Sequence, residues 1–167
     1  LCSMPMDEDG LLPWMSRETQ NNPDHALLYT IPTFQNPTGI VMPRPRRKKL
    51  LQYCNEMHLP VIEDDVFRDL WLDAPPPPPI KSLDEYGNVV YISSLSKCFA
   101  PGLRLGWLVG PEAVVQRLAD VKMQIDYGVS VLTQQVAEEL LRTGLYEKGV
   151  QNIRSQLTER RDFMMQL

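Results

Sequence analysis

Apolar positions divide the chain into short runs and longer periodic stretches. Short runs rich in β-branched residues predict strands at residues 26–31, 59–62, 89–92 and 105–109. Stretches in which apolar residues recur every three or four positions predict helices at 43–57, 110–125, 131–142 and 146–167. Residues 1–5 are expected to form a further short strand, and residues 13–20 a weak helix. This order of elements predicts an α/β fold in layers.

The predicted helices have distinguishable faces. In the helix at 43–57, the apolar spacing predicts one buried stripe, made of Leu50, Leu51, Cys54 and Met57. Basic residues at 44–49 cluster near the start of this helix. In an acidic chain they favour a solvated helix face over a nucleic-acid patch. The helix at 110–125 is expected to turn its apolar residues largely inward, and these are Val115, Leu118, Val121, Met123 and Ile125.

Composition narrows the class of protein. The 167 residues are 43% hydrophobic and 23% charged, which is typical of a soluble globular domain with one core. The formal net charge of −4 gives no overall basic character that would indicate nucleic-acid binding. Cys2, Cys54 and Cys98 are odd in number and widely spaced, which favours reduced thiols in a cytoplasmic protein over disulfides or a zinc site.

The sequence gives little support for a metal site, a catalytic triad or a membrane-spanning helix. His25 and His58 alone argue against a histidine-based metal site or a Ser-His-Asp triad, so no metal is expected. No apolar run is long enough to span a membrane. The chain opens without an initiator methionine and closes inside a helical pattern, so we expect it to be a piece of a larger protein.

The stretch from Ser94 to Trp107 holds the densest candidate chemistry. It follows the apolar strand at 89–92 and offers Ser94, Ser96, Lys97 and Arg104 within a short span. A lysine just past a buried strand is a candidate Schiff-base nucleophile, because partial desolvation lowers the pKa of its amine. In an extended chain the two serines point the same way, and with the arginine they form a plausible phosphate cradle. A carbonyl cofactor that bears a phosphate would need that combination.

Two other interpretations of this stretch stay open. Serine and lysine at a strand end are often only a solvated turn, and on these residues alone that interpretation has about equal weight. Ser94-x-x-Lys97 also matches the serine–lysine signature of penicillin-binding acyl enzymes. That family further needs a Ser-Asp-Asn and a Lys-Thr-Gly element, and the sequence contains neither.

Two further strand ends carry polar groups. The loop Asn36-Pro37-Thr38-Gly39 follows the strand at 26–31, where ligands bind in open α/β sheets, although a structural turn capped by Asn36 is the simpler interpretation. Glu63-Asp64-Asp65 follows the strand at 59–62. These carboxylates are compatible with a divalent metal, with one partner for a cationic ring nitrogen, or with capping of the next element. Prolines at 75–79 indicate a rigid surface connector or, alternatively, a ligand for a proline-binding module.

Together, these separated elements resemble the large domain of fold-type I aminotransferases of class I/II. The resemblance covers nearly the whole chain. Finer features look most like the aminotransferase-like domain of MocR-type regulators, in which a GntR-type winged helix precedes such a domain. These features are residues 33–39, residues 63–66, the proline run and residues 100–107.

The resemblance implies a three-layer large domain with a mainly parallel sheet that is incomplete at both ends. Residues 1–167 would be a partial pyridoxal-phosphate-binding domain, and residues 145–167 would begin the helix that leads to a small domain beyond residue 167. The first strands would precede residue 1. The strand nearest the start would then lack its neighbour, and it is expected to be poorly ordered or paired differently.

The resemblance also implies roles for the polar residues. Lys97 would hold pyridoxal 5′-phosphate as an internal aldimine and shuttle the α-proton. Asp64 would pair with the protonated pyridine nitrogen, and Asn36 would donate to the phenolic oxygen of the ring. The cofactor phosphate would be held by Ser94, Ser96 and Arg104.

One position departs from the family pattern. The residue three after Asp64 is commonly a tyrosine that bonds the phenolic oxygen, and here it is Phe67, which has no hydroxyl. This departure favours a sensing role over fast transamination.

Three hypotheses follow for function. The first is the cofactor-binding domain of a MocR-type transcriptional regulator that senses pyridoxal phosphate or an amino compound, with DNA bound only through an upstream winged helix. The second is part of a free-standing aminotransferase that moves an amino group between an amino acid and a 2-oxo acid. The third is a piece with no function of its own. A homodimer is expected for the full-length protein in the first two cases.

Overall fold

The computed structural model describes residues 2–13 and 26–167. It divides into two compact units, which are described separately. Unit 1 comprises residues 1–65, 76–93 and 108–117, and unit 2 comprises residues 66–75, 94–107 and 118–167. The helix expected at 13–20 lies outside the described residues, apart from residue 13.

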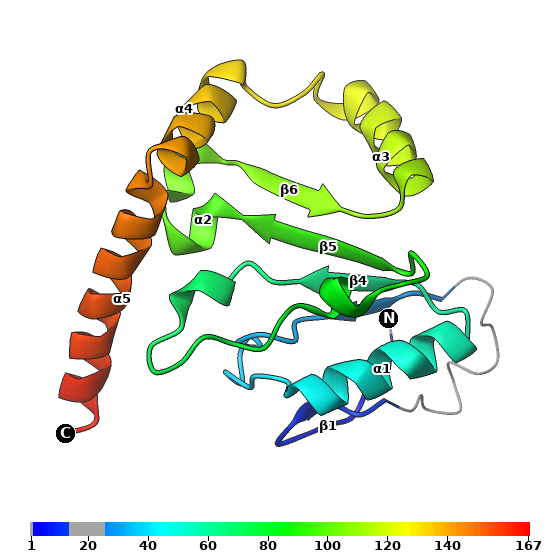
Figure 1. The fold of residues 1–167 in the computed structure, drawn as a ribbon, viewed down its shortest axis with the longest axis horizontal. Helices are drawn as coiled ribbons and strands as arrows, with labels where there is room; N and C mark the ends of the chain where they lie inside the picture. The colour runs from blue at the N-terminus through cyan, green and yellow to red at the C-terminus, as the bar shows by residue number, and fades with distance from the viewer. Residues whose placement is uncertain (1, 14–25) are drawn as a thin grey trace. The chain divides into compact units, whose positions relative to one another are not determined.

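A four-stranded sheet contains all the strands predicted from residue 26 onward. Its order is β3 (Leu28–Thr30), β4 (Val61–Asp64), β5 (Val89–Ser94) and β6 (Gly106–Val109) (Figure 1). The β3–β4 and β4–β5 pairs are parallel, with Val61 opposite both Leu28 and Val89. The mainly parallel α/β architecture expected from the sequence is therefore confirmed.

The expected strand at residues 1–5 is wrong. Residues 2–5 form no strand, and β1 (Met6–Asp7) instead pairs antiparallel with β2 (Gly10–Leu11) in a separate small sheet. Gly10 has a positive φ of 95°, which glycine adopts without steric cost, so it can close this tight hairpin. β1 and β2 are hydrogen-bonded to each other and are not part of the four-stranded sheet.

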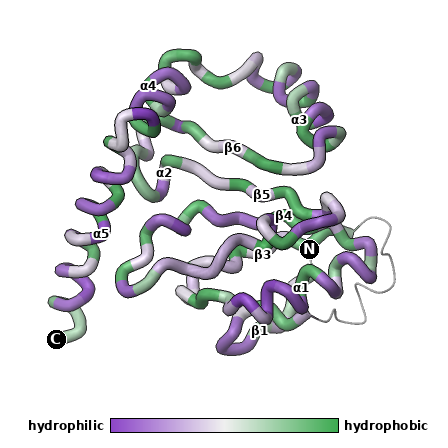
Figure 2. Tube along the Cα trace, in the orientation of Figure 1, coloured by the Kyte–Doolittle hydropathy of each residue, from purple (hydrophilic) through white to green (hydrophobic). Residues whose placement is uncertain are grey.

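The core of unit 1 lies between helix α1 (Arg44–Glu56) and the sheet. Leu50, Leu51 and Cys54 of α1 are buried, as the sequence predicts, and they pack with the inward residues of β3, β4 and β5. Figure 2 shows the resulting mixture of hydrophobic and hydrophilic positions around α1. The buried members of this cluster are Leu11, Leu28, Met42, Leu50, Leu51, Cys54, Leu59, Val61, Ile80 and Val89.

The basic residues at 44–49 were expected to form a solvated face, and for Arg47 this expectation is wrong. Its side chain has 0% exposure and lies 3.7 Å from Glu63, which is equally buried. Burying a guanidinium is tolerable only if its donors find acceptors. Hydrogen bonds reach the carbonyl oxygens of Met42 (2.8 Å), Pro32 (2.9 Å) and Pro78 (3.3 Å), and the hydroxyl of Thr33 (3.1 Å).

Glu63 connects this network to the segment that follows the proline run. Its two carboxylate oxygens accept hydrogen bonds from the backbone N–H groups of Ile80 (2.7 Å) and Lys81 (2.8 Å), which open the short 3₁₀ turn Ile80–Leu83. Burial raises the pKa of Glu63, although these two donors and the Arg47 charge oppose the shift. The proline run therefore ends at a fixed anchor in the core.

Unit 2 is organised along helix α5 (Leu145–Met164), which follows α4 (Val131–Arg142). The segment around the 3₁₀ turn Arg68–Leu70 holds α5 at three points along its length. The three contacts are a hydrogen bond of Tyr146 to Asp69 (2.5 Å), a cation–π contact of Arg154 with Trp71 (4.0 Å) and an ion pair of Arg161 with Asp73 (2.7 Å).

Gly149 lets α5 approach Phe99 closely. A Cβ atom at residue 149 would lie 2.1 Å from Cε2 of Phe99, far inside van der Waals contact. The Phe99 ring also packs against Tyr146, with ring centroids 5.5 Å apart. Glycine is required here by space, because a helix interior otherwise favours alanine.

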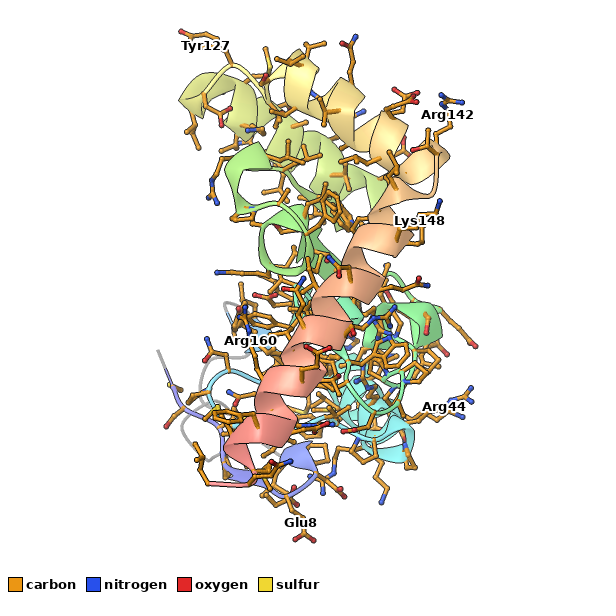
Figure 3. The ribbon with its side chains drawn as sticks, turned by 90° about the vertical axis from the view of Figure 1, so that its left-hand side faces the viewer. Glu8, Arg44, Tyr127, Arg142, Lys148 and Arg160 are labelled. Carbon is orange, nitrogen blue, oxygen red and sulfur yellow. The ribbon has the colours of Figure 1, made fainter. Side chains whose placement is uncertain are left out.

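Helix α3 (Glu112–Ile125) contradicts the expectation of an inward apolar face. None of its residues is buried, and Leu118 and Ile125 are 42% and 75% exposed. The apolar period predicts the helix and its amphipathic character, but burial depends on what packs against that face. In the turn after α3, Tyr127 projects outward as well (Figure 3). Among the described residues, no helix combines the length and apolar content needed to cross a membrane.

We predict that Arg47→Met destabilises the protein by about 3–5 kcal/mol, because Glu63 would remain as a buried charge without its counter-ion. Urea unfolding followed by circular dichroism measures this loss. The double variant Arg47→Met/Glu63→Gln should recover part of it, since both charges are then removed. Arg44→Met, at the exposed start of the same helix (Figure 3), should change stability by less than about 0.5 kcal/mol. Equal losses for the variants at 44 and 47 would contradict the role of the buried network.

We also predict that Gly149→Ala lowers stability by about 1–2 kcal/mol. The overpacking against Phe99, about 1–3 kcal/mol, outweighs the gain of up to about 1 kcal/mol in helix propensity. In a Phe99→Leu background the steric conflict is relieved, so the same substitution should become neutral or stabilising. An unchanged cost in both backgrounds would show that the Phe99 ring is not what excludes a side chain at residue 149.

Candidate functional site

The pleat of β4 separates the carboxylates that the sequence places together. Thr30 on β3 and Glu63 on β4 are buried on the core side, whereas Tyr29 and Asp64 are more exposed, as expected for alternate positions on the opposite face of the sheet. Asp64 ends β4 and pairs in register with Ile92 of β5. Within the described chain, no group of three potential ligands could hold a metal ion.

A hydrogen bond joins Tyr29 to Asp64, and sequence reasoning missed it. The phenol hydroxyl of Tyr29 donates to Oδ2 of Asp64 at 2.5 Å. Burial, followed by the hydrogen bond and the charge of Asp64, raises the pKa of Tyr29 to about 12. The parallel register places Tyr29 opposite Ile62, two residues before Asp64, so both side chains leave the same face of the sheet. Pairing of the two predicted strands in this register was the signal that could have found the contact.

The loop at residues 32–40 is held by Gln35, contrary to the simple view of a turn capped by Asn36. The amide oxygen of Gln35 accepts hydrogen bonds from the backbone N–H (2.9 Å) and the hydroxyl (2.5 Å) of Thr38. Its amide nitrogen donates to the backbone oxygen of Asn36 at 2.8 Å. Asn36 is exposed, and it takes part in this network through its backbone oxygen. The contacts that hold the loop are therefore those of Gln35.

In unit 2, Lys97 lies on the four-residue helix α2 (Leu95–Cys98), which starts directly where β5 ends. The hydroxyl of Ser94 caps this helix by accepting from the backbone N–H of Ser96 at 3.0 Å, and it donates to the carbonyl oxygen of Leu105 at 3.0 Å. The chain is thus helical after Ser94, and the extended geometry expected for the two serines is wrong. Ser94 instead fixes α2 to the segment that leads into β6.

Arg104 and Ser96 come together, as the sequence suggests. Nη1 of Arg104 lies 3.4 Å from the hydroxyl oxygen of Ser96, after the 3₁₀ turn Pro101–Leu103. Arg104 has a φ of 51°, in the left-handed region that costs a non-glycine residue about 1–3 kcal/mol. A guanidinium and a hydroxyl within hydrogen-bond distance form a donor pair suited to a phosphate.

Two other predicted site residues differ from expectation or lie elsewhere. Lys97 is exposed, so the partial desolvation expected from its place after a strand is not provided by the described residues. Phe67 precedes the 3₁₀ turn Arg68–Leu70, half-buried, and its carbonyl oxygen accepts from Leu70 at 2.9 Å. It contributes an apolar ring and no hydrogen bond of its own side chain.

The residue after Lys97 belongs to a series of hydrogen-bonded polar side chains that no sequence pattern indicated. The thiol of Cys98 is 3.2 Å from the hydroxyl of Tyr146, which donates to Asp69. Burial raises the pKa of the Cys98 thiol, against the opposing hydrogen bond with Tyr146. The same burial, together with the bonds to Asp69 and Cys98, raises the pKa of Tyr146. The residue after Lys97 is thereby tied to helix α5.

Two hollows are described in unit 1, and one of them is lined by a predicted site residue. The larger, of about 920 Å³, is lined by α1 and by the segment before β5, including Arg44, Tyr86 and Asn88, and it contains no predicted site residue. A smaller one of about 200 Å³ is lined by residues that include Tyr29 and Asn36. Of these two hollows in the described part of unit 1, the smaller one contains residues connected with the candidate chemistry, Tyr29 and Asn36.

The comparisons with family models and with solved structures indicate the same family. The family model for aminotransferases of class I and II matches residues 5–167. The chain belongs to the aminotransferase class I and II family. Solved structures agree with this assignment. The kynurenine aminotransferase of Pyrococcus horikoshii has a TM-score of 0.89 and 34% identity over 98% of this chain and 42% of its own. LysN, the α-aminoadipate aminotransferase of Thermus thermophilus, solved with N-(5′-phosphopyridoxyl)-L-leucine, has a TM-score of 0.84 and 32% identity over 98% and 42%.

Among curated sequences, this aminotransferase domain is similar to proteins named as regulators. The HTH-type transcriptional regulator YdfD of Bacillus subtilis is 50% identical over 99% of this chain and 34% of its own length. The HTH-type transcriptional regulator NorG of Staphylococcus aureus is 43% identical over 84% and 31%. The chain therefore spans about a third of the length of these relatives. It is an aminotransferase-like domain of the kind found in HTH-type regulators.

The residues present fit pyridoxal 5′-phosphate, the cofactor of this family. Lys97 carries an exposed primary amine, the group to which this cofactor would attach, and Ser96 and Arg104 bring together a hydroxyl and a guanidinium that would donate to its phosphate. The carboxylate of Asp64 would be an acceptor for a protonated ring nitrogen. Ser94 fits less directly, since its hydroxyl already caps α2 and donates to Leu105.

We predict that only one of the three cysteines reacts quickly with a thiol reagent in the folded protein at pH 8. Cys2 is exposed, while burial raises the pKa of Cys54 to about 12 and also raises that of Cys98. Because the thiolate is the nucleophile, the two buried thiols should react only after denaturation. Time courses with Ellman's reagent and mass mapping measure this order, and Cys2→Ser should abolish the fast phase. Fast labelling of Cys98 would show that α2 and α5 do not enclose it.

Proposed function

We propose that this chain is the pyridoxal-phosphate-binding part of a MocR-type transcriptional regulator, with the cofactor attached to Lys97. The observation that carries the proposal is the arrangement on and after α2, where the exposed Lys97 adjoins the Ser96–Arg104 pair at 3.4 Å. The 50% identity to a relative named as an HTH-type regulator supports the regulatory part. In this proposal an amino acid or amine acts as the effector, and DNA is bound by a winged helix outside these residues.

Each proposed site residue has a task that its chemistry allows. The bound cofactor would supply an electron sink for charge that develops at the α-carbon of an amino compound. Lys97 would hold the cofactor and exchange a proton at its Nζ atom. Ser96 and Arg104 would bind the phosphate, with Ser94 fixing the helix that presents them. Asp64 would accept from the ring nitrogen.

The remaining two residues concern the phenolic oxygen of the cofactor. The Asn36 side chain is exposed on a loop that Gln35 already stabilises, so its amide is available to donate to that oxygen. Phe67 would contact the cofactor through its ring alone. With one donor fewer at the phenolic oxygen, slow turnover is expected, which suits a sensor better than a rapid enzyme.

A second candidate function is that of a free-standing aminotransferase. It is favoured by the TM-scores of 0.89 and 0.84 to enzymes with that activity. The two functions differ in what an added amino acid does. An enzyme releases a 2-oxo acid over repeated turnovers, whereas a sensor changes its absorption spectrum and DNA affinity with little product. In either case a cytoplasmic homodimer is the proposed state of the full-length protein.

We predict that the full-length protein containing this chain develops a visible absorption band with pyridoxal 5′-phosphate, and that borohydride fixes the adduct on Lys97. Peptide mapping by mass spectrometry locates it. Lys97→Ala should lose both the band and the adduct, while Lys148→Ala should retain them. Lys148 is the matched control, because it is an exposed lysine of unit 2 that points away from its helix α5 (Figure 3). Adducts spread over surface lysines, with no dependence on residue 97, would refute the cofactor site.

A further inference from the structure

The backbone of β4 does not by itself determine the orientation of the Asp64 carboxylate. It is the last residue of β4, and it is half-buried on the face of the sheet opposite Glu63. A carboxylate there can rotate about its side-chain bonds, and holding it still for a ligand costs conformational entropy. A hydrogen bond present before the ligand arrives removes part of that cost from binding.

Tyr29 supplies such a bond from the neighbouring strand. Its hydroxyl lies 2.5 Å from Oδ2 of Asp64, and the partner is a charged group, for which hydrogen bonds are stronger than between neutral groups. The phenol ring is rigid, so the position of its oxygen is set by β3. Each carboxylate oxygen can accept more than one hydrogen bond, so the contact with Tyr29 does not exhaust the acceptor capacity of Asp64.

The surroundings of Tyr29 also connect it with the rest of the candidate site in unit 1. Tyr29 and Asn36 line the same hollow of about 200 Å³. None of the described side chains that line this hollow is ionisable apart from that of Tyr29 itself, and the charge that acts on the phenol from the described residues is that of Asp64. β3 thus carries Tyr29 toward Asp64 and continues into the loop that presents Asn36.

We propose that Tyr29 is a positioning residue for the cofactor, because its hydroxyl holds the Asp64 carboxylate in the orientation that accepts the protonated ring nitrogen. Tyr29 acts through Asp64 and does not contact the reacting atoms. This inference rests on the proposed function above. It adds a residue that the sequence patterns do not single out, and it assigns to β3 a part in cofactor binding.

The test is a double-mutant cycle on the dissociation constant of pyridoxal 5′-phosphate in the full-length protein. Tyr29→Phe removes the hydroxyl and keeps the ring, so we expect the dissociation constant to rise about three- to tenfold, because only part of the free energy of that hydrogen bond serves to hold Asp64 ready for the ligand. In an Asp64→Asn background, the same substitution should change it less than about twofold, because its target is already altered. Tyr86→Phe is the matched control, since Tyr86 is 80% exposed in the same unit, and it should bind like the unaltered protein.

A second measurement reads the contact without any cofactor. Ultraviolet difference titration of the unaltered protein against Tyr29→Phe isolates the ionisation of Tyr29, expected near pH 12. Asp64→Asn should move that ionisation down toward the ordinary value of about 10. This readout separates a real Tyr29–Asp64 bond from a general packing effect of the phenol.

The outcomes distinguish this inference from the function on which it rests. Cofactor binding on Lys97 that is unaffected by Tyr29→Phe overturns the positioning role and leaves the proposed function intact. An equal effect of Tyr29→Phe in both backgrounds also overturns it, because Tyr29 would then act by another route. Failure of the unaltered protein to bind the cofactor overturns both, even if the titration shows the bond to Asp64.

Discussion

The guanidinium of Arg47 is the buried charge on which unit 1 depends. It donates hydrogen bonds to the residues that open the loop at 32–40, to Met42 shortly before α1 and to the proline run, and it faces Glu63 on β4. In a low-dielectric interior, none of these groups can be left without a partner at small cost. The loop that carries Asn36 and the strand that carries Asp64 are therefore held by one cation that takes no part in the proposed chemistry.

Because β4 is pleated, the adjacent carboxylates of Glu63 and Asp64 point to opposite faces of the sheet. Glu63 faces the core and serves structure, while Asp64 faces the other side and can serve a ligand. A shift of one residue in the register of β4 would exchange them, which would turn Asp64 into the core and Glu63 out of it. The hydrogen bonds that Glu63 accepts at Ile80 and Lys81 therefore also protect the orientation of Asp64.

The sequence predicted the elements that depend on local pattern. It missed the contacts between residues that lie far apart in the same chain. The strands from residue 26 onward and the main helices follow from periodicity, whereas Ser96 meets Arg104 from a short helix and not from the extended chain that was expected. The burial of Arg47 and the contact of Tyr29 with Asp64 join residues 16 and 35 positions apart, and no local rule places them. The exposure of Lys97 and of the α3 face likewise depends on what packs against them, which periodicity does not state.

Helix α5 is clamped by Trp71 and Asp73, and near its start Tyr146 is bonded to Asp69 and touches the thiol next to Lys97. A helix is stiff along its axis, so a push or twist applied near its far end is not absorbed on the way. It must either break the contact at Cys98 or carry α2 with it. Mechanical strain on the C-terminal end of α5 would thus reach α2, the helix that carries Lys97, about five helical turns away.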